Sequence, residues 1–195
     1  MTTSRTTPPA PLRTAFQRLL CERQTAHEFF NEEIPQETIE RALSCAIRAP
    51  NHYLTNPWRF TILGMETRKA ISKANAGLVE AKRGADAAQS KYARWMGIPN
   101  WMLVTSVRDA DPVRERENYA ACCCAVQNFA LALHAEGISC KWTSGAVTRL
   151  DEFPEIAGYD ATEESFVGLF WFGWPRRELP ATRREKLESV IRYRD

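Results

Sequence analysis

The chain lacks every short motif that marks a familiar catalytic centre. No Gly-x-Gly-x-x-Gly follows a predicted strand, and neither Gly-x-x-x-x-Gly-Lys-Ser/Thr nor Gly-x-Ser-x-Gly occurs. These absences argue against a Rossmann dinucleotide site, a P-loop and a hydrolase nucleophile elbow. With 3 histidines, the material for a catalytic triad is also scarce. We therefore assign no catalytic side chain and expect the chemistry to be delegated to a cofactor.

Patterns for metals and redox pairs are missing too. The 6 cysteines include no Cys-x-x-Cys pair, and no spacing of Cys and His suits zinc. Cys122, Cys123 and Cys124 would point about 100° apart on a helix, so they cannot hold one metal together. We expect small buried thiols in a reducing compartment and no metal site.

Long apolar runs and a strong charge imbalance are also absent. The net charge is +2, which gives no footprint for nucleic acid or a membrane surface. No bilayer-spanning run and no signal peptide are visible, so a cytoplasmic location is the default expectation. What is present is 44% hydrophobic residues, with 6 Trp and 9 Phe, which is typical of a globular protein. We predict a disordered tail at residues 1–11 and a single domain over residues 12–195.

Hydrophobic periodicity predicts helices alternating with strands. Helices are expected over residues 12–22, 35–49, 67–94, 114–136 and 150–156, and strands over residues 57–63, 101–107, 138–143 and 166–172. Hydrophobic strands separated by helices indicate a sheet covered on both faces. The helix over residues 114–136 is apolar on several sides, so it belongs at the centre of the domain or in a dimer interface.

Two polar clusters stand out as binding candidates. The first, Arg23-Gln24-Thr25-Ala26-His27, offers a guanidinium, an amide, a hydroxyl and an imidazole just after the first helix. Such donors suit a phosphate or a polyol, although a solvated polar loop explains the same residues. The second runs from Arg48 to Phe60 through two prolines. Prolines fix the shape of a loop, so this segment is either a binding loop or a plain connector.

The order of these clusters and of several later segments resembles the nitroreductase family of FMN-dependent oxidoreductases. The matching segments, in chain order, are Arg23-Gln24-Thr25 with Phe29, Ala49-Pro50, Asn56-Pro57-Trp58-Arg59-Phe60, Ala121 to Gly137 with Gln127-Asn128, Trp142-Thr143-Ser144-Gly145, Val167-Gly168, Gly173-Trp174-Pro175 and Lys186 to Ile191. The likeness covers nearly the whole chain. Each motif alone is weak, and it is their shared order that makes the resemblance specific.

The resemblance implies an α+β sandwich with a mainly antiparallel central sheet flanked by helices, assembled as an entwined homodimer. It implies FMN as cofactor, NADH or NADPH as co-substrate, and a small-molecule acceptor such as a nitroaromatic, a quinone or an enone. Carried over by position, the cofactor-binding residues are Arg23, Gln24, Thr25 and His27 near the phosphate and ribityl chain, Arg48 and His52 from the partner subunit, Trp142, Thr143 and Ser144 beside the isoalloxazine, and Arg176 or Arg177 as further phosphate charge. These roles agree with the need of a phosphate dianion for several cationic donors.

Three positions depart from the family pattern. Gln24 stands where a second Arg is usual, His27 where a basic residue is usual, and Thr143 where short members carry Arg. Each change removes fixed positive charge, so we expect FMN affinity and flavin potential below those typical of the family. His27 restores charge only below its pKa, which is near 6.5 when unperturbed.

Other functions fit the same residues. Reductive dehalogenation or flavin fragmentation is one alternative, with residues 67–101 as a lid over the flavin. A non-catalytic flavin-binding or flavin-delivering protein is a second, and a plain interaction domain without flavin is a third. Trp95, Trp101 or Trp174 is a candidate for covering the flavin, whereas Trp171 is expected in the core.

Overall fold

A four-stranded antiparallel sheet forms the centre of the computed structural model, which describes residues 10–180 and 182–194. Its strands are β1 (Trp58–Ile62), β2 (Asn100–Val107), β3 (Ser139–Thr143) and β4 (Glu164–Gly173), in the spatial order β1-β2-β4-β3. The register shifts between Val104 and Thr105, where β2 meets β4. The sheet confirms the predicted strands and the predicted α+β class.

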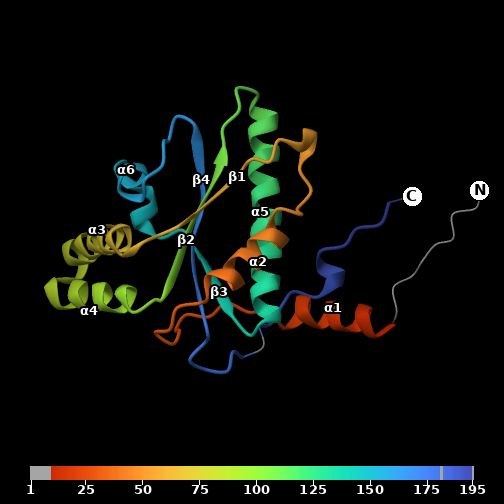
Figure 1. Ribbon diagram of the computed structural model, residues 1–195, viewed down its shortest axis with the longest axis horizontal. Coiled ribbons are helices and arrows are strands. Elements are labelled where there is room, and N and C mark those ends of the chain that lie inside the picture. Colours follow the sequence, from red (N-terminus) through yellow and green to blue (C-terminus); the bar gives the residue numbers. More distant parts are fainter. Residues whose placement is uncertain (1–9, 181, 195) are drawn as a thin grey trace, which may run out of the picture.

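Helices cover both faces of this sheet. They are α1 (Ala10–Glu22), α2 (Gln36–Ala46), α3 (Met65–Arg83), α4 (Ala85–Met96), α5 (Pro112–Ala135) and α6 (Phe153–Ala157), with 3-10 turns η1 (His52–Leu54), η2 (Ala146–Arg149) and η3 (Leu187–Ser189). In Figure 1, α2 and α5 lie on one side of the sheet and α3, α4 and α6 on the other. The layers form the sandwich that the sequence predicts.

Two hydrophobic clusters, one on each face of the sheet, hold the layers together. Successive residues of a strand point to opposite faces. Phe170 and Phe172 of β4 therefore pack toward α5, whereas Trp171 of β4 and Trp101 of β2 pack toward α3 and α4. Full burial of such a side chain stabilises the fold by about 1.5–3 kcal/mol. Trp171 is in the core as predicted, and Trp101 is fully buried, so it does not serve as a flavin cover.

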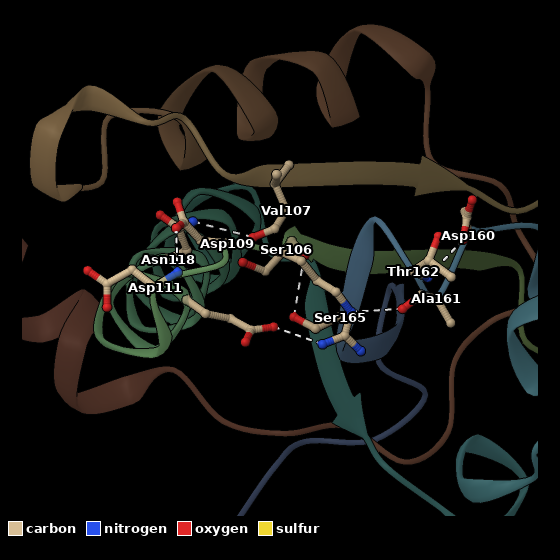
Figure 2. Close-up of polar contacts among 11 residues, drawn as sticks. Ser106, Val107, Asp109, Asp111, Asn118, Asp160, Ala161, Thr162 and Ser165 are labelled. Carbon is tan, nitrogen blue, oxygen red and sulfur yellow. Dashed lines mark hydrogen bonds and ion pairs between the residues drawn. The ribbon is translucent and has the colours of Figure 1, made fainter.

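A network of polar contacts fixes the start of α5 to the ends of β2 and β4 (Figure 2). Asp111 caps α5, because its Oδ1 accepts a hydrogen bond from the backbone N–H two residues further on, at 2.9 Å. Asn118 Nδ2 donates to the carbonyl of Val107 at 3.3 Å, and Arg108 Nε donates to the carbonyl of Ala161 at 2.8 Å. These contacts fix the position of α5 against the sheet. They therefore also fix the α5 side chains that face the loop before β1.

The segment predicted as one helix over residues 67–94 is two helices, α3 and α4, folded into a hairpin at Gly84. The φ of Gly84 is 83°, a left-handed conformation that glycine adopts without strain. Gly77 lies inside α3 without interrupting it. Arg68 of α3 is buried and donates to two carbonyls of the turn before β2, at 2.6 and 3.0 Å. The hairpin is thereby tied to the sheet.

Helix α1 stands apart from the body of the chain (Figure 1). It begins at Ala10, so the last two residues of the predicted tail are helical, and residues 1–9 lie outside the described residues. None of its residues is buried within the chain. Leu12, Phe16 and Leu20 are large apolar side chains that it exposes.

The cysteines are less buried than predicted. Cys122 and Cys140 are buried, and burial raises the pKa of both thiols to about 11. Cys21, Cys45 and Cys124 are exposed, so the expectation of buried thiols is wrong for these three. The reason is that the helices carrying them present these positions to solvent rather than to the core.

Over residues 10–180 and 182–194, no cluster of His, Cys, Asp or Glu side chains has the composition to hold a metal ion. In the same part of the chain, no helix is both long enough and apolar enough to cross a membrane.

Candidate functional site

The first predicted cluster lies where three segments distant in sequence meet. Thr25 forms a parallel β-bridge with Cys140 of β3, and Phe29 forms an antiparallel bridge with Pro175, just after β4. Arg23 lies near enough to Cys140 for its charge to oppose the burial that raises the pKa of that thiol. The fold therefore places this cluster beside β3 and beside the chain that follows β4, which carry most of the other predicted cofactor residues.

A cavity of about 470 Å³ opens beside this junction, between the α3–α4 hairpin and the sheet. Two predicted residues, His27 and Thr143, line it. Ser144 is exposed next to Thr143 in the chain, and Gln24 is half-buried, but neither lines the cavity. The other lining residues are Asn75, Leu78, Val79, Lys82, Arg83, Lys91, Arg94, Trp95, Lys141, Gly145, Ala146 and Trp171. A cavity of this size suits a small organic ligand.

Trp142 lies across β4 and does not line the cavity. Its indole Nε1 donates to the carbonyl of Val167 at 3.2 Å, and its ring centroid is 5.1 Å from that of Phe170. Gly168 permits this close approach, because a Cβ there would fall 2.2 Å from the indole nitrogen. Trp142 and Thr143 were both predicted beside the isoalloxazine. Since adjacent strand residues face opposite sides of a sheet, only Thr143 reaches the cavity within one chain.

Of the two arginines predicted to add phosphate charge, Arg176 is the better placed. Its backbone N–H donates to the carbonyl of Glu28 at 3.1 Å. With His27 it lines a second cavity, of about 520 Å³. The guanidinium of Arg177 instead makes an exposed ion pair with the carboxylate of Glu28, at 3.2 Å. Arg176 thus keeps its charge available beside the first cluster.

The main cavity holds more positive charge than the family motifs predict. Lys141 of β3 and Arg94 of α4 both line it. Burial, followed by the charges of Lys141 and Arg94, lowers the pKa of His27, so this side chain is neutral over a wider pH range than an ordinary histidine. The charges of this cavity come from lysines and arginines spread over two helices and a strand. Such scattered positions form no local motif.

Arg48 and His52 lie in another part of the chain. Arg48 follows α2 and is exposed. His52 begins η1, and its Nδ1 lies 2.8 Å from Oε2 of Glu117 on α5. An open depression of about 420 Å³ beside His52 shares no lining residue with the cavity beside His27. Within one described chain, the structure does not bring Arg48 and His52 together with the first cluster.

The loop that carries His52 has an unusual backbone. Tyr53, Leu54 and Asn56 have φ values of 56°, 52° and 47°, in the left-handed region that is unfavourable for residues with a side chain. The Oδ1 of Asn51 accepts a hydrogen bond from the backbone N–H of Asn56 at 3.0 Å and closes the loop. Tyr53 is 73% exposed and Leu54 is 78% exposed. The loop therefore presents two large apolar side chains to its surroundings.

Comparison with known proteins gives relatives for the sequence and for the fold. The model of the Nitroreductase family matches residues 20–174. YfhC of Bacillus subtilis, a provisionally assigned NAD(P)H nitroreductase, is 27% identical over 166 residues, which cover 83% of this chain and 84% of YfhC. A nitroreductase-like family protein from Bacillus cereus has a TM-score of 0.81 at 23% identity, over 100% of both chains. Iodotyrosine deiodinase bound to FMN and 3-iodo-L-tyrosine has a TM-score of 0.70 at 22% identity, over 92% of this chain and 98% of the deiodinase.

Proposed function

The chain belongs to the nitroreductase family, and we propose that it is an FMN-dependent oxidoreductase that reduces a small-molecule acceptor with NADH or NADPH. Nitroaromatics, quinones and enones are the acceptor classes expected. When bound, FMN would supply the redox chemistry, namely hydride transfer from the nicotinamide and onward transfer of electrons. The observation that carries the proposal is the meeting of the first cluster, β3 and the chain after β4 beside one cation-lined cavity.

The residues at this cavity fit FMN. The cofactor presents a phosphate and ring carbonyl oxygens, which all accept hydrogen bonds. The cavity presents donors on the side of the first cluster and β3, among them Lys141, the imidazole of His27 and the hydroxyl of Thr143. No aspartate or glutamate lines the cavity to repel a phosphate. An excess of donors is what such a ligand needs in order to leave water.

Each part of the site has a separate task in this proposal. Arg23, Thr25 and Arg176 bind the phosphate through charge-assisted and hydroxyl hydrogen bonds. Lys141 and His27 lie on the cavity side of the same junction and stabilise negative charge on the reduced ring. The α3–α4 hairpin and its Trp95 wall the cavity and exclude water. Because positioning and electrostatics do this work, no side-chain acid or base is required.

We further propose that residues 12–195 form one domain that acts as a homodimer, with Arg48 and His52 serving the partner's site. Two observations support this. Helix α1 exposes its apolar side chains and buries none within the chain, and contiguous apolar patches of this kind mark interaction surfaces. The strained loop after Asn51 projects two further apolar side chains.

The substitution Arg23→Ala tests the placement of the cofactor. Hydrogen bonds to charged groups contribute about 1.5–3 kcal/mol, so Arg23→Ala should weaken FMN binding about 10- to 150-fold in an equilibrium titration. Arg149→Ala is the matched control, because Arg149 is exposed and lines neither cavity. A variant that holds FMN as tightly as the wild type contradicts this placement.

Anaerobic titration of the purified wild-type protein tests the function itself. A flavin spectrum that NADH or NADPH bleaches is expected. A colourless protein that does not take up FMN contradicts the proposal and favours an interaction domain. A yellow protein that neither nicotinamide bleaches favours a flavin-binding or flavin-delivering role.

Sharing of the site between subunits is tested by mixing two defective variants. A heterodimer of Arg23→Ala and Arg48→Ala would have one doubly defective site and one intact site if the two residues serve one site from different chains. Random exchange makes about half of the dimers mixed, so about a quarter of all sites should regain tight FMN binding. If each residue serves the site of its own chain, every site stays defective and nothing is regained.

Reductive dehalogenation is a second candidate, favoured by the α3–α4 hairpin that forms one wall of the cavity. Such a wall can enclose an aromatic substrate against the cofactor. Release of iodide or bromide from a halogenated phenol, measured under anaerobic turnover, distinguishes this activity from nitro or quinone reduction.

A further inference from the structure

The cavity beside His27 is lined by five side chains of fixed positive charge. Lys82 and Arg83 end α3, Lys91 and Arg94 belong to α4, and Lys141 lies on β3. No aspartate or glutamate lines the same cavity. Among residues 10–180 and 182–194, none of the five takes part in an ion pair. Cations gathered in one concave place, without carboxylates, attract an anion.

These cations act on one another. Burial, and then the charges of Arg94 and Lys91, lowers the pKa of Lys141. Burial, and then the charges of Arg94 and Arg83, lowers the pKa of Lys91. Arg94 is thus the cation whose charge acts most strongly on both Lys141 and Lys91. Repulsion of this kind is relieved when an anion lies among the charges.

Neutral donors and apolar walls narrow the kind of ligand. Asn75 and Trp171 line the cavity and are nine-tenths buried, yet Asn75 Nδ2 and Trp171 Nε1 have no acceptor among the described residues. Buried N–H groups without partners are rare in native proteins. Leu78, Val79 and Trp95 complete the lining with apolar surface. The lining therefore suits an apolar or aromatic body that carries a negatively charged, acceptor-rich group.

Most of these charges are separate from the residues assigned to the cofactor. Arg23, His27, Thr143 and Arg176 belong to the junction of the first cluster with β3 and the chain after β4. The charges at positions 82, 83 and 91 belong to the α3–α4 hairpin, on the other wall of the cavity, and Arg94 of the same hairpin also lines the second cavity beside Arg176. Resting on the proposed function, we infer that this hairpin selects the electron acceptor, and that the acceptor is a small organic anion, a carboxylate or a phosphate with an aromatic or apolar body.

A matched pair of acceptors tests the inference in the FMN-loaded protein. 4-Nitrobenzoate and 4-nitrobenzamide share the nitro group and nearly the same size but differ in charge. The readout is the ratio of their kcat/KM values, compared between proteins so that the intrinsic reactivity of each acceptor cancels. Arg94→Gln should lower the benzoate-to-benzamide ratio about two- to five-fold. Lys73→Gln, on the exposed side of α3 and outside the cavity lining, should leave the ratio as in the wild type.

Direct binding gives a second readout without turnover. Trp95 and Trp171 line the cavity, so a bound nitroaromatic should quench their fluorescence. The wild type should bind the benzoate more tightly than the amide, and Arg94→Gln should reduce this difference. Because the Debye length falls from about 10 Å at 0.1 M salt to about 3 Å at 1 M, high salt should weaken benzoate binding and leave amide binding nearly unchanged.

Three results would overturn the inference. The first is an equal ratio in the wild type and in Arg94→Gln. The second is benzoate binding that is insensitive to salt. The third is an Arg94→Gln variant that loses FMN or NADPH affinity while its acceptor ratio stays constant, since the cations would then serve the cofactor or the nicotinamide. Failure of the proposed function looks different, because a protein that binds no FMN can still be titrated with the two nitroaromatics by quenching.

Discussion

Adding a single methyl group at Gly168 should displace Trp142 from its place across β4. A Cβ at this position would lie 2.2 Å from the indole Nε1, 2.7 Å from its Cδ1 and 2.8 Å from Cε2 of Phe170. Distances this short are not tolerated, so a neighbour must move. Phe170 is fully buried, whereas Trp142 is 42% exposed, so the indole is the group that should swing out toward solvent.

The cost follows from the contacts that the indole would lose. The hydrogen bond from Nε1 to the carbonyl of Val167 contributes about 0.5–1.5 kcal/mol, and the aromatic contact with Phe170 contributes a similar amount. We therefore expect Gly168→Ala to lower the free energy of unfolding by about 1–3 kcal/mol. For a chain of this length that corresponds to a fall in Tm of roughly 3–10 °C.

Thermal and urea unfolding of four proteins would measure this effect. They are the wild type, Gly168→Ala, Trp142→Ala and the double variant. In the Trp142→Ala background the indole clash is gone, so Gly168→Ala should cost at least about 1 kcal/mol less there than in the wild type. Equal costs in the two backgrounds would refute the idea that Gly168 exists to accommodate the indole. An increase in the quenching of Trp142 by iodide in Gly168→Ala would support the outward swing.

Three further outcomes are expected. Burial raises the pKa of the Cys122 and Cys140 thiols to about 11, so at pH 8 only about one thiol in a thousand is the reactive thiolate. Both should therefore react with Ellman's reagent only after denaturation. Rapid modification of either thiol in the native protein would contradict their burial. Arg68→Met should lower the free energy of unfolding by about 2–4 kcal/mol in urea titrations, because two buried carbonyls lose a charged donor, whereas Lys73→Met on the exposed side of the same helix should change it by less than about 0.5 kcal/mol. Burial and the neighbouring cations Lys141 and Arg94 lower the pKa of His27, so its imidazole should titrate below 6.5 by NMR. Because the fold favours the neutral form, the contribution of His27 to stability is present above pH 6.5 and is lost as the pH falls through the lowered pKa. A titration midpoint above 6.5 would argue against the effect of those charges.

The strands were predictable because their signals are local. β1 to β4 each carry a run of apolar and β-branched or aromatic residues bounded by turn residues, and the structure confirms all of them. The meeting of the segment after α1 with β3 was predictable only through the family resemblance, because no local pattern links Thr25 to Cys140.

The split between α3 and α4 could not be predicted from pattern alone. Gly77 and Gly84 look alike in the sequence, and only the turn of the hairpin distinguishes the left-handed Gly84 from the helical Gly77. The cationic wall was missed for a related reason. Lysines and arginines on a polar, Ala-rich helix are ordinarily solvated, and only the packing of the hairpin against the sheet brings Arg94 near Lys141.

Arg68 illustrates a different limit. An arginine followed by a lysine in an amphipathic helix is usually a surface residue, yet this guanidinium is buried beside the turn before β2. Its partners are backbone carbonyls, which leave no trace in the side-chain pattern of either segment. Contacts of this kind depend on how distant segments pack in the folded chain, so sequence patterns alone do not predict them.

The left-handed backbone at Tyr53, Leu54 and Asn56 bears on how this protein could be engineered. A residue with a side chain in that region costs about 1 kcal/mol that glycine would avoid. Leu54→Gly is therefore a route to a more heat-resistant chain, whereas the side chain of Asn56 donates a hydrogen bond to the carbonyl of Leu54 at 3.0 Å that glycine would lose. If the glycine variant lost subunit affinity or catalytic rate, the size of that loss would measure the functional contribution of the native side chain that it replaces.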